Sequence, residues 1–194
     1  MTLAQIYCRI WACLAAAAAD APPEPAAFKA MQAATVGLDG SPSVRTVLLR
    51  KVSEPERLVT FHTDLRSPKL AELEREPRIA LVGVDVTHNL QIRVSGKAAI
   101  VRQDAARQLA WRSSPDHSLL IYRTALAPGT PIGRPDDAFA AGHRSDETEG
   151  FANFCVVEVR LESLEWLKHS ANGRHERSRY VRTGATWEPG WIAP

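Results

Sequence analysis

Residues 90–101 carry the pattern that most constrains the fold, an alternation of apolar and polar side chains. Leu90, Ile92 and Val94 are each followed by a polar residue. Successive side chains of a strand point to opposite faces, so this segment predicts a strand with one buried and one polar face. It is the clearest strand in the chain.

Short apolar runs separated by turns occupy much of the remaining sequence. Residues 31–52 contain two such runs around Asp39-Gly40, a pair typical of hairpin turns. Many short strands with few crossover helices between them predict a mainly β domain with peripheral helices, closed into a barrel or split barrel. Further strands are expected at residues 58–63, 79–84, 153–161, 164–167, 179–182 and 186–191.

Three segments between the strands have helical patterns. Ser67 is a good N-cap and Pro68 suits the first helical position, which predicts a helix over residues 67–75. Residues 103–112 and 118–126 are also expected to be helical. Residues 127–150 are rich in Pro, Gly and polar residues, and a loop of that length is usually functional or disordered.

The N-terminal segment allows two interpretations. IWACLAAAAADA (10–21) resembles the apolar core and small-residue end of a signal peptide, but Ala-rich sequence also favours a helix. We prefer a helix packed on the domain. We therefore expect an N-terminal helix and Pro-rich linker over residues 1–25, with Pro22, Pro23 and Pro25 in the linker, and one domain over residues 26–194.

Composition excludes several classes of function. The 194 residues carry a net charge of +2 from 24 basic and 22 acidic side chains, which argues against a nucleic-acid or membrane-surface partner. Three cysteines and six scattered histidines match neither a disulfide framework nor a metal site. Such cysteine usage fits a reducing cytoplasm, and no segment is apolar enough to span a membrane.

The segment FHTDLRSPKLAEL (61–73) concentrates polar groups at the start of a predicted helix. A helix N-terminus offers free N–H groups and a partial positive charge, and Arg66 and Lys69 add full charges. This arrangement predicts an anion site. An ordinary capped surface helix with solvated charges explains the same residues equally well.

The sequence lacks the common catalytic motifs, including the P-loop, the G-x-S-x-G elbow and a G-x-G-x-x-G helix start. Polar groups suited to a phosphorylated, planar heteroaromatic ligand remain: Arg45 and Arg50 flanking TVLL, Gln91 on its strand, and the arginines of NGRHERSRY (172–180). Each arginine taken singly is also compatible with a surface charge. Arg45 and Arg50 are an odd number of positions apart, so a regular strand places them on opposite faces unless a bulge realigns them.

Three consecutive segments resemble the flavin-binding blocks of the pyridoxamine 5′-phosphate oxidase family. They are RTVLLR (45–50), FHTDLRSPKLAELEREPRIAL (61–81) and QIRVSGKA (91–98), and LEWLKHSANGRHERSRY (164–180) resembles the closing segment of that family. The likeness is greatest to the FMN-binding, oxidase-like branch. It implies a six-stranded split β-barrel of Greek-key type, a homodimer with FMN at the interface, and a small-molecule substrate.

The resemblance also implies which residues bind FMN. Arg45 and Lys69 would hold the phosphate, with His62, Thr63 and Ser67 lining the phosphate and ribityl end. The strand from Thr46 through Val47 and Leu48 to Arg50 would lie along the ring. The partner subunit would contribute Gln91, Trp166 and Arg177. The resemblance to the family fixes the position of Trp166 to within one residue.

The substrate side departs from the family pattern. An Arg-x-His pair is expected where the chain reads Gly173-Arg174-His175, so His175 is kept and the arginine is displaced. Ser118 matches a serine for the substrate phosphate, but its partner arginine is missing. Arg50 stands for a lysine that contacts substrate, and a planar guanidinium cannot replace a compact ammonium.

These observations give three hypotheses of function. The first is an FMN-dependent oxidoreductase, with pyridoxamine or pyridoxine phosphate as one specific substrate; the sequence identifies no catalytic residue. The second is a flavin-binding carrier or redox-sensing protein without turnover. The third is an anion-binding interaction module that holds no flavin.

Overall fold

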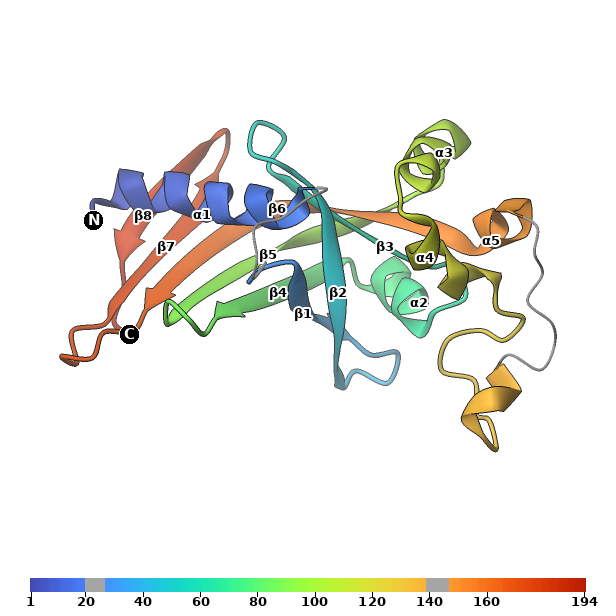
Figure 1. Ribbon diagram of the computed structural model, residues 1–194. Helices are drawn as coiled ribbons and strands as arrows, with labels where there is room; N and C mark the ends of the chain where they lie inside the picture. The colour runs from blue at the N-terminus through green and yellow to red at the C-terminus, as the bar shows by residue number, and fades with distance from the viewer. Residues whose placement is uncertain (20–26, 139–146) are drawn as a thin grey trace.

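Within residues 1–19, 27–138 and 147–194, which the computed structural model describes, eight strands form one antiparallel sheet (Figure 1). The spatial order is β3-β2-β1-β4-β5-β6-β7-β8, and pairing of β3 with β6 closes the first six strands into a barrel. The strands are β1 (Ala30–Val36), β2 (Pro42–Ser53), β3 (Leu58–Asp64), β4 (Arg78–Asp85), β5 (Leu90–Val101), β6 (Phe154–Lys168), β7 (Glu176–Thr183) and β8 (Thr186–Trp191). The predicted fold class, a mainly β six-stranded split barrel, is confirmed.

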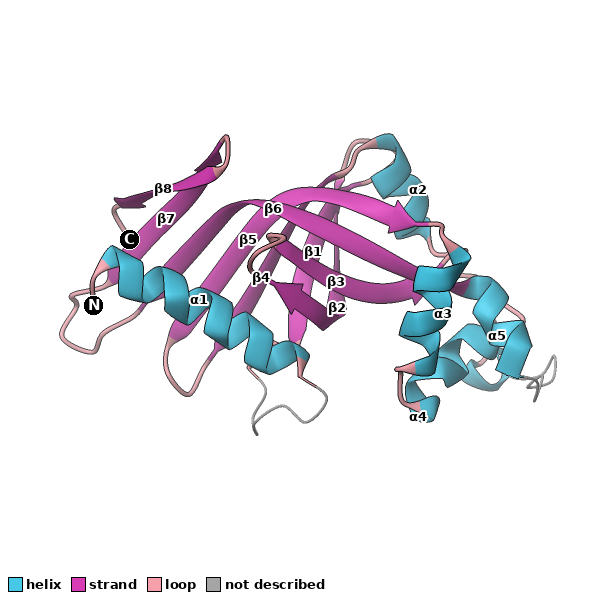
Figure 2. Ribbon diagram, turned by 90° about the horizontal axis from the view of Figure 1, so that it is seen from above, coloured by secondary structure: helices cyan, strands magenta, loops and turns pink. Residues whose placement is uncertain are grey.

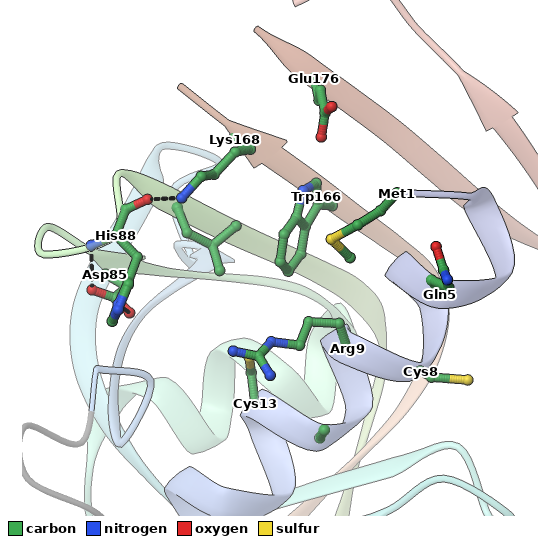
Figure 3. Close-up of a pocket in the computed structure, with 12 residues that line it drawn as sticks. Met1, Gln5, Cys8, Arg9, Cys13, Asp85, His88, Trp166, Lys168 and Glu176 are labelled. Atoms are coloured by element: carbon green, nitrogen blue, oxygen red, sulfur yellow. Dashed lines mark hydrogen bonds and ion pairs between the residues drawn. The ribbon is translucent and has the colours of Figure 1, made fainter. Parts of the chain in front are cut away.

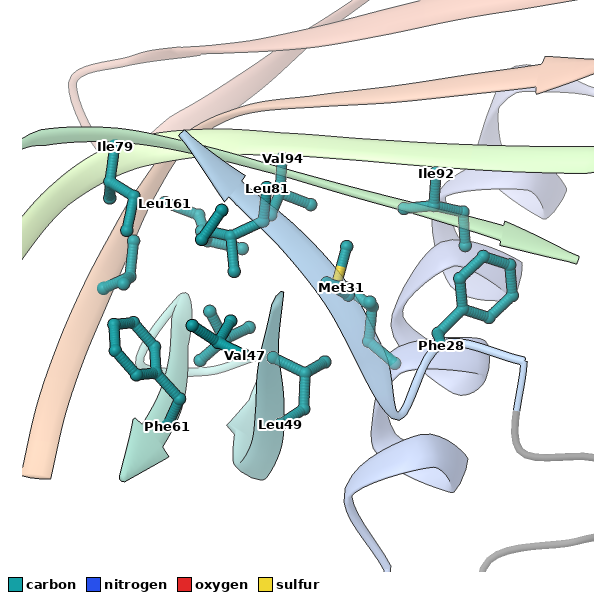
Figure 4. Packing of buried hydrophobic residues seen from close by; sticks show 14 of the residues in the cluster. Phe28, Met31, Val47, Leu49, Phe61, Ile79, Leu81, Ile92, Val94 and Leu161 are labelled. Carbon is teal, nitrogen blue, oxygen red and sulfur yellow. The ribbon is translucent and has the colours of Figure 1, made fainter. Parts of the chain in front are cut away.

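Alternation along the strands fills the barrel with apolar side chains. Leu90, Ile92 and Val94 of β5 are all buried, as their spacing predicts. Figure 4 shows Ile92 and Val94 in the core cluster with side chains of other strands, among them Met31 and Phe61. The polar residues between them therefore face out of the barrel.

Two β-bulges shape the barrel wall. One lies between Leu49 and Lys51, where β2 pairs with β3. The other lies between Ser95 and Gly96, where β5 pairs with β6. A Cβ on Gly96 would lie 2.0 Å from the carbonyl oxygen of Arg160, so only glycine fits this approach of the two strands.

Helix α1 (Leu3–Ala18) lies across the sheet and contacts β2, β6 and β8 (Figures 1 and 2). Its N-terminus is a capping box between Thr2 and Gln5. Ile6 and Ile10 of α1 are part of the main core. No helix among the described residues is long and apolar enough to cross a membrane.

The remaining helices gather at one end of the molecule (Figure 1). They are α2 (Pro68–Arg75), α3 (Asp104–Arg112), α4 (Asp116–Leu119), α5 (Glu147–Asn153) and the 3-10 turns η1 (Leu120–Arg123) and η2 (Pro135–Ala138). Helix α2 buries Leu70 and Leu73 in the barrel core. Tyr122 and Phe154 belong to a second, smaller core, and Trp111 packs against it.

Several boundaries differ from the sequence-based expectations. The strands expected at 153–161 and 164–167 are one strand, β6, because Glu162 is only a bulge in the pairing with β5 and Ser163 pairs again, with Ser95. The segment 127–150 includes η2 and the start of α5. The Pro-rich linker lies outside the described residues, so the division at residue 25 stays a prediction.

Candidate functional site

Lys69 organises the start of α2. Its Nζ donates hydrogen bonds to Thr63 Oγ1 on β3 at 2.8 Å and to Ser67 Oγ at 2.6 Å. Ser67 is the N-cap residue, as predicted, but its hydroxyl faces Lys69 and makes no capping hydrogen bond. The ammonium is therefore held at the first turn of the helix, as the sequence suggested. We call Arg45, Thr63, Ser67 and Lys69 the α2 cluster.

Two cations of the α2 cluster lie close to each other. Burial lowers the pKa of the Lys69 ammonium, and the charge of Arg45 lowers it further. The two like charges repel each other, and the nearby carboxylates of Asp64 and Glu72 oppose this repulsion. A further anion at the ammonium would oppose it more, so this arrangement favours binding of an anion.

Arg45 lies on the core-facing side of β2, in phase with Val47 and Leu49. Its guanidinium forms an ion pair with Glu72 of α2 at 2.7 Å and donates further hydrogen bonds to Thr35 and Ser43. Arg45 thus joins β1, β2 and α2.

Arg66, the other cation of the predicted anion site, has a different role. It forms an ion pair with Asp64 at 2.7 Å and donates to the carbonyl oxygens of Thr124 and Ala125 at 3.0 and 3.1 Å. It therefore fastens the β3–α2 turn to the segment after η1 and takes no part in the α2 cluster.

A groove that none of the α2 cluster residues lines lies between α3 and the outer surface of β2, β3 and β6. Its volume is about 290 Å³. Its polar lining includes Arg50 and His62, and its apolar lining includes Leu109, which is 73% exposed. We call it the α3 groove. Arg45 and Arg50 consequently face different surfaces, as their odd spacing predicts for a strand, and the bulge does not realign them.

His62 gives the α3 groove a neutral polar group. Burial, and then the charges of Arg50 and Lys29, lower the pKa of its imidazole to about 4. Ser114 Oγ lies 3.4 Å from His62 Nδ1, and the ring packs edge-on against Phe154 with centroids 4.8 Å apart. Within the described chain, Arg50 has no hydrogen-bond or ion-pair partner, so its charge is available to a ligand.

Gln91 and Arg177 lie on a different part of the sheet. Both pair with Leu167, Gln91 from β5 and Arg177 from β7, so the three residues share the outer face. Arg177 forms an ion pair with Glu165 at 2.9 Å, and its buried Nε has no partner among the described residues. We call Gln91, Leu167 and Arg177 the β7 cluster.

Trp166 points away from the β7 cluster. It is 4% exposed and packs in the core on the side of α1. It lines a larger cleft of about 700 Å³ between α1 and the end of the barrel, together with Arg9 and Lys168 (Figure 3). This cleft holds none of the other predicted residues. Because strand residues alternate, Leu167 is the neighbour that shares a face with Gln91 and Arg177.

The α2 and β7 clusters are far apart within one chain. Thr63 pairs with position 155 of β6, whereas Gln91 and Arg177 pair with position 167 of the same strand. At roughly 3.3 Å per residue this separation is about 40 Å along the strand. One chain therefore does not bring the predicted residues together.

The remaining predicted residues have mixed placements. On β2, Val47 is buried in the core, whereas Thr46 and Leu48 face outward. Ser118 Oγ donates to the carbonyl of Pro115 at 2.7 Å and does not line the α3 groove. His175 is exposed, next to His169 with ring centroids 4.9 Å apart.

Three residues of these sites were missed from the sequence. Leu167 could have been found by continuing the alternation of β6 from Leu164. Glu72 could not, because an acid in a charged helix looks solvated. Ser114 follows a helix end and carries no motif.

Curated relatives match most of the chain. A pyridoxine/pyridoxamine 5′-phosphate oxidase from Rubrobacter xylanophilus is 32% identical over 182 residues, covering 84% of this chain and 74% of the relative. One from Arabidopsis thaliana is 29% identical over 154 residues, covering 74% and 75%. The chain is thus similar to named oxidases over the barrel as a whole.

Solved structures show the same fold. A pyridoxamine 5′-phosphate oxidase-related, FMN-binding protein from Nostoc punctiforme superposes with a TM-score of 0.79 at 24% identity, covering 100% of both chains. PhzG from Burkholderia lata superposes with a TM-score of 0.71 at 20% identity, covering 86% of this chain and 83% of PhzG. At these identities the likeness concerns the fold.

The sequence model of the family described as pyridoxamine 5′-phosphate oxidase matches residues 22–139. This range contains β1 to β5, the α2 cluster and most of the lining of the α3 groove. The chain therefore belongs to the pyridoxamine 5′-phosphate oxidase family.

Proposed function

We propose that this protein is an FMN-binding oxidoreductase that binds the cofactor phosphate at the α2 cluster. The observation that carries the proposal is Lys69, held by Thr63 and Ser67 at the start of a helix beside a second cation. Ammonium, hydroxyl and helix N–H groups are the donors that a phosphate needs. The donor set therefore fits FMN, and the named FMN-binding relative of the same fold supports this choice.

The chain's own residues would set the environment of the reaction. Bound FMN would accept a hydride from the substrate. Arg50 would supply a positive charge in the α3 groove, and His62 would supply a hydrogen-bonding group that stays neutral at physiological pH. The exposed side of Leu109 would shield the ligand from water.

A second copy of the chain would complete the site. We propose a homodimer in which the β7 cluster of one subunit meets the α2 cluster of its partner. Three observations support it: the separation of the two clusters along β6, the Nε of Arg177 that lacks a partner among the described residues, and exposed apolar residues on the outer sheet face, including Val44 at 63% and Leu48 at 43%. The free Cys8, Cys13 and Cys155 are compatible with a cytoplasmic location.

Pyridoxamine or pyridoxine phosphate is the specific substrate that the names of the relatives suggest. The placement of Ser118 and His175 outside the α3 groove favours a second candidate function, a flavin carrier or redox sensor that does not turn over. The two functions differ in whether a donor reduces the bound flavin.

Anaerobic reduction separates these functions. The FMN-loaded protein is mixed first with pyridoxine 5′-phosphate and then, in a separate sample, with NADPH, and the visible flavin bands are followed. The oxidoreductase is expected to lose its absorbance near the flavin maximum with one donor. If the flavin bands persist with both donors, neither pyridoxine 5′-phosphate nor NADPH reduces the bound flavin, and the carrier or sensor function is favoured.

A further inference from the structure

Glu72 is a buried acid on a surface helix. It is 6% exposed, between Ala71 and Leu73 on α2, and Leu70 and Leu73 of the same helix are buried in the barrel core. Burial of a carboxylate is costly unless it is paired and hydrogen-bonded. An acid at this buried position is therefore explained by the groups that it contacts and not by helix formation.

Both carboxylate oxygens of Glu72 are satisfied. Oε2 accepts hydrogen bonds from Thr35 Oγ1 at 2.5 Å and from Arg45 Nη2 at 2.7 Å, and Oε1 accepts one from Ser43 Oγ at 3.1 Å. Burial alone would raise the pKa of the Glu72 carboxyl, but the hydrogen bonds from Thr35 and Arg45 outweigh it and lower the pKa below the ordinary value. Glu72 is thus ionised at neutral pH.

These contacts fix the guanidinium of Arg45. An arginine has five N–H donors in a rigid fork. Nη1 donates to Thr35 Oγ1 and to the Ser43 carbonyl, and Nη2 donates to Ser43 Oγ and Glu72. Among the described residues only the Nε–H has no acceptor. The fork is therefore locked in one orientation, with its charge beside Lys69.

Glu72 also offsets repulsion between the two cations. The charge of Arg45 disfavours the protonated form of Lys69, whereas the charge of Glu72 favours it. Without the carboxylate, the two cations would separate in the absence of an anion, and the flexible arginine would be the one to move.

From these contacts we propose that Glu72 is a positioning residue for the phosphate end of the cofactor, acting through Arg45. The proposal rests on the proposed function. It predicts that Glu72 strengthens FMN binding although it carries the same sign of charge as the phosphate. A carboxylate that merely repelled the ligand would have the opposite effect.

The test compares FMN with riboflavin, which has the same ring and ribityl chain but no phosphate. The ratio of the two dissociation constants reports phosphate recognition, whereas a general loss of structure weakens both ligands alike. The variants are Glu72→Ala, Glu72→Gln, Arg45→Ala and the double variant Arg45→Ala/Glu72→Ala. Glu74→Ala is the matched control, since Glu74 lies on the same helix and is half exposed.

Glu72→Ala is expected to lower the preference for FMN by about tenfold, the size of one charge-assisted hydrogen bond. Glu72→Gln keeps an acceptor for Arg45 and is expected to lose less of the preference for FMN. Glu74→Ala is expected to keep the full preference. In the Arg45→Ala background, removing Glu72 should change the preference no further. If Glu72→Ala does not fold, the preference of Glu72→Gln for FMN over riboflavin tests the inference instead.

Two results overturn the inference: a preference in Glu72→Gln above that of the wild type, or a loss in Glu72→Ala that persists in the Arg45→Ala background. A wild type that binds neither flavin, or binds both equally, is a failure of the proposed function itself. The two failures are thus distinguishable.

Discussion

Gln91 and Arg177 face each other across Leu167, with which both pair on the outer face of the sheet. Trp166, which precedes Leu167 on β6, points to the opposite side, into the core and the cleft beside α1. The β7 cluster is therefore a surface feature, and its polar groups are presented to whatever covers that face. A homodimer would cover it with the α2 cluster of a second copy.

Subunit complementation tests this arrangement. Lys69→Met damages the α2 cluster and Arg177→Met damages the β7 cluster, while Glu165 keeps its ion pair with Arg179 at 2.9 Å. If each site combines clusters from two subunits, a heterodimer of the two variants has one intact site and one with both defects. Co-expression with two affinity tags and isolation of the heterodimer should give about one FMN per dimer at wild-type affinity.

The controls are the homodimers of the two variants, one of each, which should bind FMN weakly at the same concentration. A heterodimer that binds no more FMN than these homodimers contradicts a site shared between subunits. A stable monomer that binds FMN contradicts it as well.

The buried His62 predicts a dependence of stability on pH. Its folded pKa of about 4 lies below the ordinary value of 6.5, so the unfolded chain binds the proton more readily between these two values. Its contribution to stability is complete above pH 6.5 and is lost as pH falls toward 4. Thermal unfolding should show a smaller loss in this window for His62→Phe than for the wild type.

The exposed His117 is the matched control for this effect. His117→Phe should retain the wild-type dependence between pH 6.5 and 4. If His62→Phe and the wild type lose stability in parallel through that window, the assignment to His62 is wrong.

The close approach of β5 and β6 at Gly96 requires a residue without a side chain. A Cβ at this position would lie 2.0 Å from the Arg160 carbonyl oxygen, so Gly96→Ala must push β5 and β6 apart at their bulge. We expect a loss of about 3 kcal/mol or more in the free energy of unfolding, measured by urea titration. Gly190→Ala on β8 meets no atom within 4 Å and should cost less than about 1 kcal/mol. Equal losses in the two variants would contradict the role of the bulge.

Most of the barrel could be predicted from the sequence because its strands carry a local signal. Alternation marked β5, and the Asp39-Gly40 pair marked the turn between β1 and β2. The length of β6 was missed because Glu162 and Ser163 resemble a turn, whereas the partner strand β5 continues past them. Strand length is decided by pairing with a distant segment, which no local pattern reports.

The cation side of the α2 cluster was predictable for a similar reason. Ser67, Pro68 and Lys69 are consecutive, and their helix start fixes where the ammonium lies. The acid that orients Arg45 was not predictable, since Arg45 and Glu72 are brought together only when α2 packs against β1 and β2. Nor does the sequence show that Leu167 faces outward and Trp166 inward, because either could be the outward residue until the strand register is known.

Flavin titration of the wild type and of Lys69→Met tests the central claim most directly. Dissociation constants for FMN and riboflavin are measured from the change in the visible flavin spectrum, with Lys97→Met, an exposed lysine on β5, as the control. We predict that the wild type and Lys97→Met prefer FMN, and that Lys69→Met loses about 10- to 100-fold in affinity for FMN but not for riboflavin. A wild type that binds neither flavin, or a Lys69→Met variant that prefers FMN as strongly as the wild type, would contradict a phosphate site at the α2 cluster.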